Sequence, residues 1–149
     1  MINHAPTTDI DIAAEARLPH AYEAAKLALA NCDSIELCID WMRRSEAIER
    51  AAQAAGNTVL YKLSLRLSAR VMRRVGELLK TSGWSDPVLT TAPENEVARS
   101  SGMSTYQQLV AVQLAELPEA GFERWLESND PPTVNKIGVS LSPDTGETR

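Results

Sequence analysis

Apolar residues recur at intervals of three and four along most of this chain, which is the spacing of one face of an α-helix. The pattern is strongest in residues 58–80, which include the run YKLSLRLSARVMRRVGELLK. At about 100° per residue, one face of this predicted helix carries Leu60, Leu63, Leu67, Val71, Val75 and Leu78. Further apolar residues widen that face to roughly 200°, so we expect the helix to contact more than one neighbour.

Two helices are predicted before this one, over residues 19–29 and 34–55. Pro19 suits a first helical turn, where its missing N–H is not needed. Asp33 and Glu36 have the spacing of a capping box, with Asp33 as the cap. The second helix should bury an apolar side made of Leu37, Cys38, Trp41, Ile48 and Ala52. Gly56-Asn57 is a good terminator, because both residues tolerate the left-handed conformation.

Shorter helices are predicted towards the C-terminus. Thr91 and Glu94 have capping-box spacing and precede a short helix over residues 94–101. Ser104 opens a helix that runs to about residue 117, Pro118 begins another, and one more turn is expected over residues 133–139. No segment alternates as a strand would over a useful length. The fold class is therefore predicted to be all-α, a helical hairpin with a helix-turn-helix-like C-terminal module.

The same signals divide the chain into segments. We expect a flexible N-terminal arm, a helical hairpin that forms a dimerisation region, a linker, a helix-turn-helix-like module and a disordered tail. These segments cover, in order, residues 1–17, 18–80, 81–93, 94–138 and 139–149.

Composition agrees with a helical domain that needs no cross-links. Apolar residues make up 44% of the 149 residues and aromatic residues 5%, a balance that favours helices over sheets. Cys32 and Cys38 match no common zinc pattern, so we expect buried, reduced thiols. The N-terminus does not have the pattern of a signal peptide, and no apolar run reaches the roughly 20 residues that span a bilayer. These features predict a cytoplasmic protein.

Catalytic patterns do not emerge from the sequence. It contains no glycine-rich phosphate loop, no His/Glu metal pattern and no convincing Ser-His-Asp order. His4 and His20 are interpreted as ordinary solvated side chains. The chain is therefore predicted not to be an enzyme, and to have neither cofactor nor metal.

The best organised local pattern is EVARSSGMSTYQQLVAVQLAELP, residues 96–118. A short helix, a glycine, an apolar residue, a serine cap and a longer helix have the spacing of a helix-turn-helix. Gly102 would supply the turn, Met103 would fill the gap between the helices, and Ser104 would cap the second helix. The alternative is an ordinary helical corner.

The sequence RSSGMSTYQQLVAVQLAELPEAGFERWLES resembles the helix-turn-helix region of ParB-like and KorB-like partition proteins. RRVGELL before it and FERWLESNDPPTV within and after it resemble segments of small helical proteins of phages and mobile elements. The resemblance covers roughly residues 40–136, and it implies DNA binding, an all-helical fold and dimerisation. The candidate base and backbone contacts of the recognition helix are Ser104, Thr105, Gln107 and Gln108.

Charge is distributed unevenly between the two halves of the chain. Residues 94–149 have a net charge of −5, and the predicted recognition helix has no Lys or Arg, so this half would repel phosphates. Residues 58–80 have a net charge of +5 and offer five candidate phosphate contacts: Lys62, Arg66, Arg70, Arg73 and Arg74. The alternative is that these cations are a bundle surface facing the acidic residues of the second helix, Glu36, Asp40, Glu46 and Glu49.

Two functions follow from these patterns. The first is a non-catalytic DNA-binding accessory or regulatory protein of phage or mobile-element type, which binds duplex DNA as a homodimer. The alternative is a protein-interaction module, an inhibitor or adaptor, whose helix-turn-helix-like shape does not bind DNA.

Overall fold

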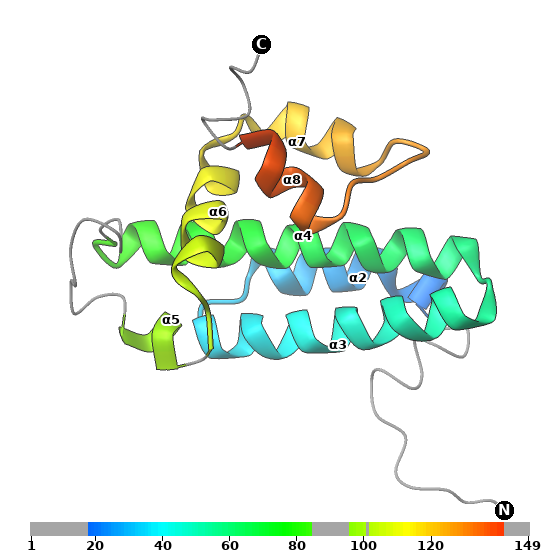
Figure 1. Ribbon diagram of the computed structural model, residues 1–149, viewed down its shortest axis with the longest axis horizontal. Coiled ribbons are helices and arrows are strands. Elements are labelled where there is room, and N and C mark those ends of the chain that lie inside the picture. The colour runs from blue at the N-terminus through cyan, green and yellow to red at the C-terminus, as the bar shows by residue number, and fades with distance from the viewer. Residues whose placement is uncertain (1–17, 85–95, 101, 142–149) are drawn as a thin grey trace, which may run out of the picture.

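The computed structural model describes residues 18–84, 96–100 and 102–141, and all regular structure in these ranges is helical (Figure 1). The predicted all-α class is therefore confirmed for this part of the chain. The predicted arm, most of the linker and nearly all of the tail lie outside the described residues, as do Thr91 and Glu94. The helices are α2 (Leu18–Ala30), α3 (Ile35–Ala55), α4 (Thr58–Thr81), α5 (Glu96–Ser100), α6 (Thr105–Glu116), α7 (Glu119–Leu126) and α8 (Val134–Leu141).

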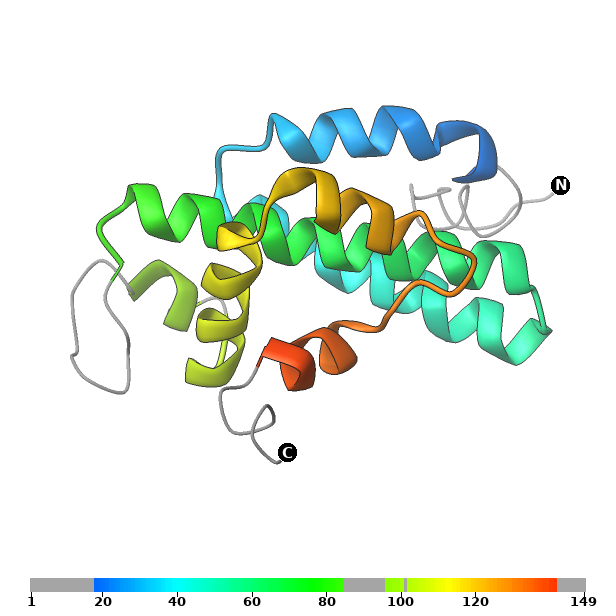
Figure 2. The same cartoon turned by 90° about the horizontal axis from the view of Figure 1, so that it is seen from above.

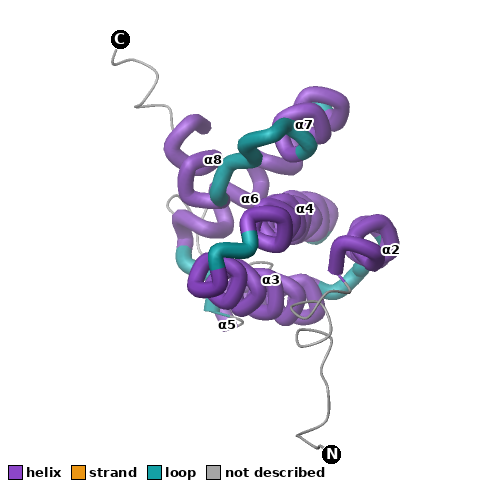
Figure 3. Tube along the Cα trace, turned by 90° about the vertical axis from the view of Figure 1, so that its right-hand side faces the viewer, coloured by secondary structure: helices purple, strands orange, loops and turns teal. Residues whose placement is uncertain are grey.

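Helix α4 lies at the centre of the fold, with α2, α3, α6 and α7 around it in the end-on view of Figure 3. It contacts α2, α3, α6 and α8. The wide apolar face predicted for residues 58–80 explains this position, because a helix with a narrow apolar stripe could not serve several neighbours. Its fully buried side chains include Leu67, Ala69, Val71, Val75 and Leu79.

The α3–α4 hairpin is built largely as predicted. Gly56 has a φ of 69° and ends α3, and the side chain of Asn57 accepts a hydrogen bond from Leu60 N to begin α4. At the start of α3 the predicted cap was wrong. Ser34, not Asp33, is the N-cap, because Ser34 has extended backbone angles and its Oγ accepts from Leu37 N at 3.2 Å.

The apolar side predicted for α3 is only partly buried. Cys38, Ile48 and Ala52 are buried against the core, whereas Leu37 is 57% exposed and Trp41 is half-buried. Contacts from α4 and α5 account for the buried stripe, and Leu37 lies outside it. Dimerisation through this region stays a prediction.

Helix α6 packs directly across α4 (Figure 2). Gly76 permits the crossing, because a Cβ at that position would overlap the carbonyl group of Ala111. Helix α7 follows α6 in the chain and lies on the side of α4 opposite to α3 (Figures 1 and 3). Buried side chains from α2 through α8 form one continuous hydrophobic cluster, so the C-terminal helices share a core with the hairpin.

The turn before α6 has the local features that the sequence predicted. Gly102 has a φ of 96°, Met103 is 6% exposed, and Ser104 forms a complete capping box with Gln107. Helix α5 contacts α3, while α6 contacts α4. The turn is therefore confirmed, and its interpretation as a DNA-binding helix-turn-helix stays a prediction.

Candidate functional site

The arginines of α4 were predicted to contact phosphates, and the structure pairs them with groups of the same chain. Arg66 donates from Nε to the carbonyl oxygen of Leu126 at 2.7 Å and from Nη2 to that of Ser128 at 3.0 Å. These carbonyls are at the C-terminal end of α7, where helical backbone acceptors lack partners and the helix dipole is negative. Arg66 therefore caps α7 from the side.

Arg73 does the same for α6. Its Nη1 and Nη2 donate to the carbonyl oxygens of Leu114 and Leu117, at 2.7 and 3.0 Å. Its guanidinium also lies 4.8 Å from the centre of the Phe122 ring, within the range of a cation–π contact. One side chain thus connects α4 to the end of α6 and to the first turns of α7.

Arg70 is the most buried of the arginines, with 9% of its side chain exposed. It forms ion pairs with Glu123 and, at 2.7 Å, with Glu127, and it donates to the hydroxyl of Tyr22. Burial raises the pKa of Tyr22 to about 12, even though Arg70 beside it favours the phenolate. Burial alone would raise the pKa of Glu127, but hydrogen bonds from Tyr22 and Arg70 and the charge of Arg66 lower it overall.

The two remaining cations differ from each other. Arg74 donates to the carbonyl oxygen of Cys32 at 2.6 Å and to Glu77 at 2.9 Å. Lys62 is half-buried and has no hydrogen bond or ion pair within the described ranges. Four of the five predicted phosphate contacts therefore already bind acceptors inside the fold, which supports the alternative of a bundle surface. Their partners come mostly from α6, α7 and the α2–α3 connection, not from the acidic residues of α3.

The predicted recognition residues are also largely occupied. Ser104 Oγ accepts from Gln107 N at 3.1 Å, and Gln107 Oε1 accepts from Ser104 N at 2.9 Å. Gln108 is fully buried, donates to the carbonyl oxygen of Met103 and accepts from the indole N–H of Trp84. Thr105 is exposed at the start of α6. The structure brings these residues together at one turn. Their side chains mostly cap or fill that turn and do not point as a set towards a ligand.

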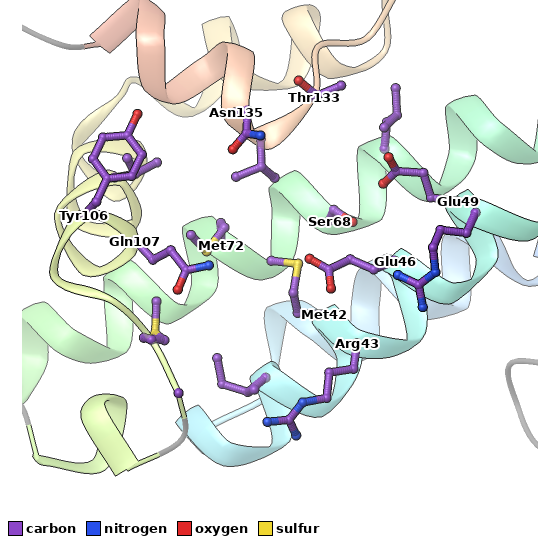
Figure 4. Close-up of a pocket in the computed structure, with 17 residues that line it drawn as sticks. Met42, Arg43, Glu46, Glu49, Ser68, Met72, Tyr106, Gln107, Thr133 and Asn135 are labelled. Atoms are coloured by element: carbon purple, nitrogen blue, oxygen red, sulfur yellow. The ribbon is translucent and has the colours of Figure 1, made fainter. Parts of the chain in front are cut away.

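A groove on another face of the molecule was not predicted. It encloses about 600 Å³ and is formed by α3, α4, α6, the turn before α6 and the start of α8. Figure 4 shows Met42 from α3, Met72 from α4 and Tyr106 from α6 around this space. Met103 also contributes to the lining, so three of the chain's four methionines are there. Methionine side chains are flexible and polarizable and adapt to varied apolar partners.

Polar groups are placed at the edge and floor of the groove. Arg43, Glu46, Glu49 and Arg50 line the groove from α3. Ser68 lines its floor from α4, across from Glu46 (Figure 4). Ser68 is 3% exposed, and its Oγ has no hydrogen-bond partner. Burial first, and then the charge of Glu46, raises the pKa of Glu49, while Arg50 lowers it. The groove lining thus mixes apolar side chains with charged and polar ones, and one buried hydroxyl in it, that of Ser68, has no hydrogen-bond partner.

The two cysteines lie together away from this groove. Both are free and buried, as predicted, and Cys38 donates its thiol hydrogen to Cys32 with the sulfurs 3.4 Å apart. Burial, and after it the hydrogen bond to Cys32, raise the pKa of Cys38 to about 12. Cys38 is therefore an unreactive packing residue.

No known protein family, characterised protein or solved structure matches this chain. Among the described residues, no three His, Cys, Asp or Glu side chains gather as metal ligands would. None of the helices in the same ranges combines the length and the apolar character that a bilayer crossing needs. Function is therefore argued from the geometry of the arginines and of the groove.

Proposed function

We propose that this chain is a non-catalytic protein-interaction module, an adaptor or inhibitor, that holds a segment of a partner protein in the groove between α3, α4, α6 and α8. The observation that carries the proposal is the contrast between two surfaces. The α4 arginines donate to groups within the fold, whereas the groove is open and is lined by three methionines and Tyr106 among charged and polar side chains.

Electrostatics favours this function over duplex DNA. A phosphate would compete with the carbonyl oxygens at the ends of α7 and α6 for the N–H groups of Arg66 and Arg73, and losing a hydrogen bond to a charged donor costs about 1.5–3 kcal/mol. Residues 94–149 have a net charge of −5, which would repel phosphates. Duplex DNA as the partner and the helix-turn-helix as its reader remain predictions that rest on the sequence resemblance.

The groove has the composition of a peptide-binding surface. An amphipathic helix commonly binds by placing its apolar face in a groove between helices, and methionine-rich linings accept many such faces. Tyr106 is 51% exposed at the α6 edge, and exposed aromatic side chains are frequent anchors in protein interfaces. An apolar side chain of the partner would enter beside Met42 and Met72.

A displayed library of random peptides selected on the full chain would test the proposal. We expect selected peptides to perturb the backbone amide NMR shifts of groove residues, and Met42→Asn and Tyr106→Ser each to weaken binding at least tenfold. Leu27→Asn is the matched control, because Leu27 is 66% exposed on α2 and is not part of the groove. Circular dichroism would verify that each variant is folded. Peptides that bind elsewhere, or that are indifferent to both groove variants, would refute the proposal.

A further inference from the structure

The α3 edge of the groove carries two carboxylates, Glu46 and Glu49, next to the guanidinium groups of Arg43 and Arg50. Within the described residues, neither Glu46 nor Glu49 takes part in an ion pair, although the acidic side chains Asp40 and Glu77 do. Burial and the charge of Glu46 raise the pKa of Glu49 by more than Arg50 lowers it, so the neighbouring arginine only partly offsets the penalty on the ionised form. A cation from outside would relieve that penalty.

The floor below them carries an independent sign of a missing partner. Ser68 is 3% exposed, and its hydroxyl has no hydrogen-bond partner, although buried hydroxyls in folded proteins are normally paired. On the same helix, Ser64 satisfies its own hydroxyl by donating to the carbonyl oxygen of Tyr61 at 2.7 Å. The Ser68 hydroxyl instead lies on the groove floor across from Glu46 (Figure 4). It can accept a hydrogen bond from a donor that enters the groove.

We propose that the occupant of the groove is a basic amphipathic helix of a partner protein, with one Lys or Arg placed between Glu46 and Glu49 and within reach of Ser68. This inference rests on the proposed function and specifies the chemistry of the partner. The apolar face of the helix packs on Met42, Met72 and Met103, and its cation supplies the donors that the carboxylates and the hydroxyl lack.

A helix suits this site better than an extended strand. The described part of the chain holds no strand, so an extended peptide would find no sheet edge to satisfy its backbone groups. A helix satisfies its backbone internally and presents side chains three and four residues apart on one face. The groove edge has the same spacing, because Met42, Glu46 and Glu49 follow one another on α3 by four and three residues. The net charge of −5 also attracts a basic partner.

The test compares peptides and variants in pairs by isothermal titration calorimetry. One groove-binding helical peptide would be made with Lys, and again with Gln, at the position next to α3. We expect the Lys peptide to bind wild type at least tenfold more tightly than the Gln peptide. The double variant E46Q/E49Q should remove that preference, and Ser68→Ala should reduce it. The control E36Q/E119Q makes the same change in net charge with exposed carboxylates outside the groove, and it should leave the preference intact.

The outcomes separate the two proposals. Peptides that bind the groove with equal affinity whether they carry Lys or Gln would overturn the basic partner and leave the interaction module standing. If E36Q/E119Q removed the Lys preference as fully as E46Q/E49Q does, the preference would be a non-specific attraction between net charges. That result would likewise overturn the proposed site. Failure of every helical peptide to occupy the groove would overturn the basic helix, and failure of every selected peptide, helical or not, would overturn both proposals.

Discussion

Gly76→Ala is expected to destabilise the fold, although the same change in an isolated helix stabilises it. Alanine is favoured over glycine in a helix interior by about 1 kcal/mol. In this protein, however, the new Cβ would overlap the carbonyl group of Ala111 and lie 3.0 Å from Val112 N. Both obstacles are backbone atoms, so α6 as a whole must move. Adding a methyl group to a packed core typically costs 1–3 kcal/mol, and this contact is at or above the upper end of that range.

The net loss is therefore about 2 kcal/mol, which corresponds to a fall in Tm of about 4–8 °C for a chain of this size. Thermal unfolding followed by circular dichroism at 222 nm would measure it. Gly121→Ala is the matched control, because its Cβ would meet only Arg124 Nη2, at 3.9 Å, and the Tm should rise by about 2–4 °C. A Gly76→Ala protein as stable as wild type would refute the close α4–α6 crossing, and with it the position of Tyr106 at the groove.

Three further expectations concern the polar contacts. Arg66→Gln should lower the free energy of unfolding in urea by about 2 kcal/mol, because it removes two charged hydrogen bonds to the end of α7; unchanged stability would contradict the capping role. Because the pKa of Glu127 is lowered in the folded state, its ionised carboxylate stabilises the fold at pH values above the ordinary pKa of 4.5. This contribution disappears as the pH falls through the folded-state pKa. Glu127→Gln should therefore flatten the loss of stability in acid, whereas an unchanged pH profile would contradict the ionised pairing with Arg70. Because the pKa of Cys38 is about 12, iodoacetamide at pH 8 should alkylate it only on unfolding, as mass spectrometry would reveal; rapid labelling of the folded chain would contradict its burial.

The course of α4 could be predicted from sequence because its signals are local. A strong apolar period and the Gly56-Asn57 terminator fix the helix within a residue or two. The turn around Gly102 and the Ser104 cap were equally accessible, since each depends on residues within one turn of each other. The cap of α3 was misassigned because Asp33 and Ser34 are adjacent and both suit the role.

The role of the arginines could not be predicted in the same way. Their spacing places them on one side of α4, but it says nothing of what lies opposite. The acceptor of Arg66 is 60 residues further along the chain, at a helix end. Nothing in the local sequence indicates that carbonyl groups, and not phosphates, meet this guanidinium.

The groove was missed for a related reason. Its lining comes from several helices that are neighbours only after folding. One signal was present in the sequence: Met42, Met72 and Met103 are nearly all of the chain's methionines, and each lies next to or within a helix that was predicted. Composition alone could not indicate that they converge. The close α4–α6 crossing at Gly76 could not be predicted either, because a glycine in a helix does not indicate which backbone approaches it.

The most direct measurement is a fluorescence-anisotropy titration of the intact chain against a labelled random duplex at 50 mM and 200 mM salt. If the α4 arginines serve the fold and the groove serves a protein partner, the duplex should not bind measurably at either salt concentration. The contradicting result would be binding at 50 mM salt in which the logarithm of the affinity falls against the logarithm of the salt concentration with a slope of about −0.9 per phosphate contact. If Lys62→Gln also weakened that binding while Arg124→Gln left it intact, the result would favour DNA.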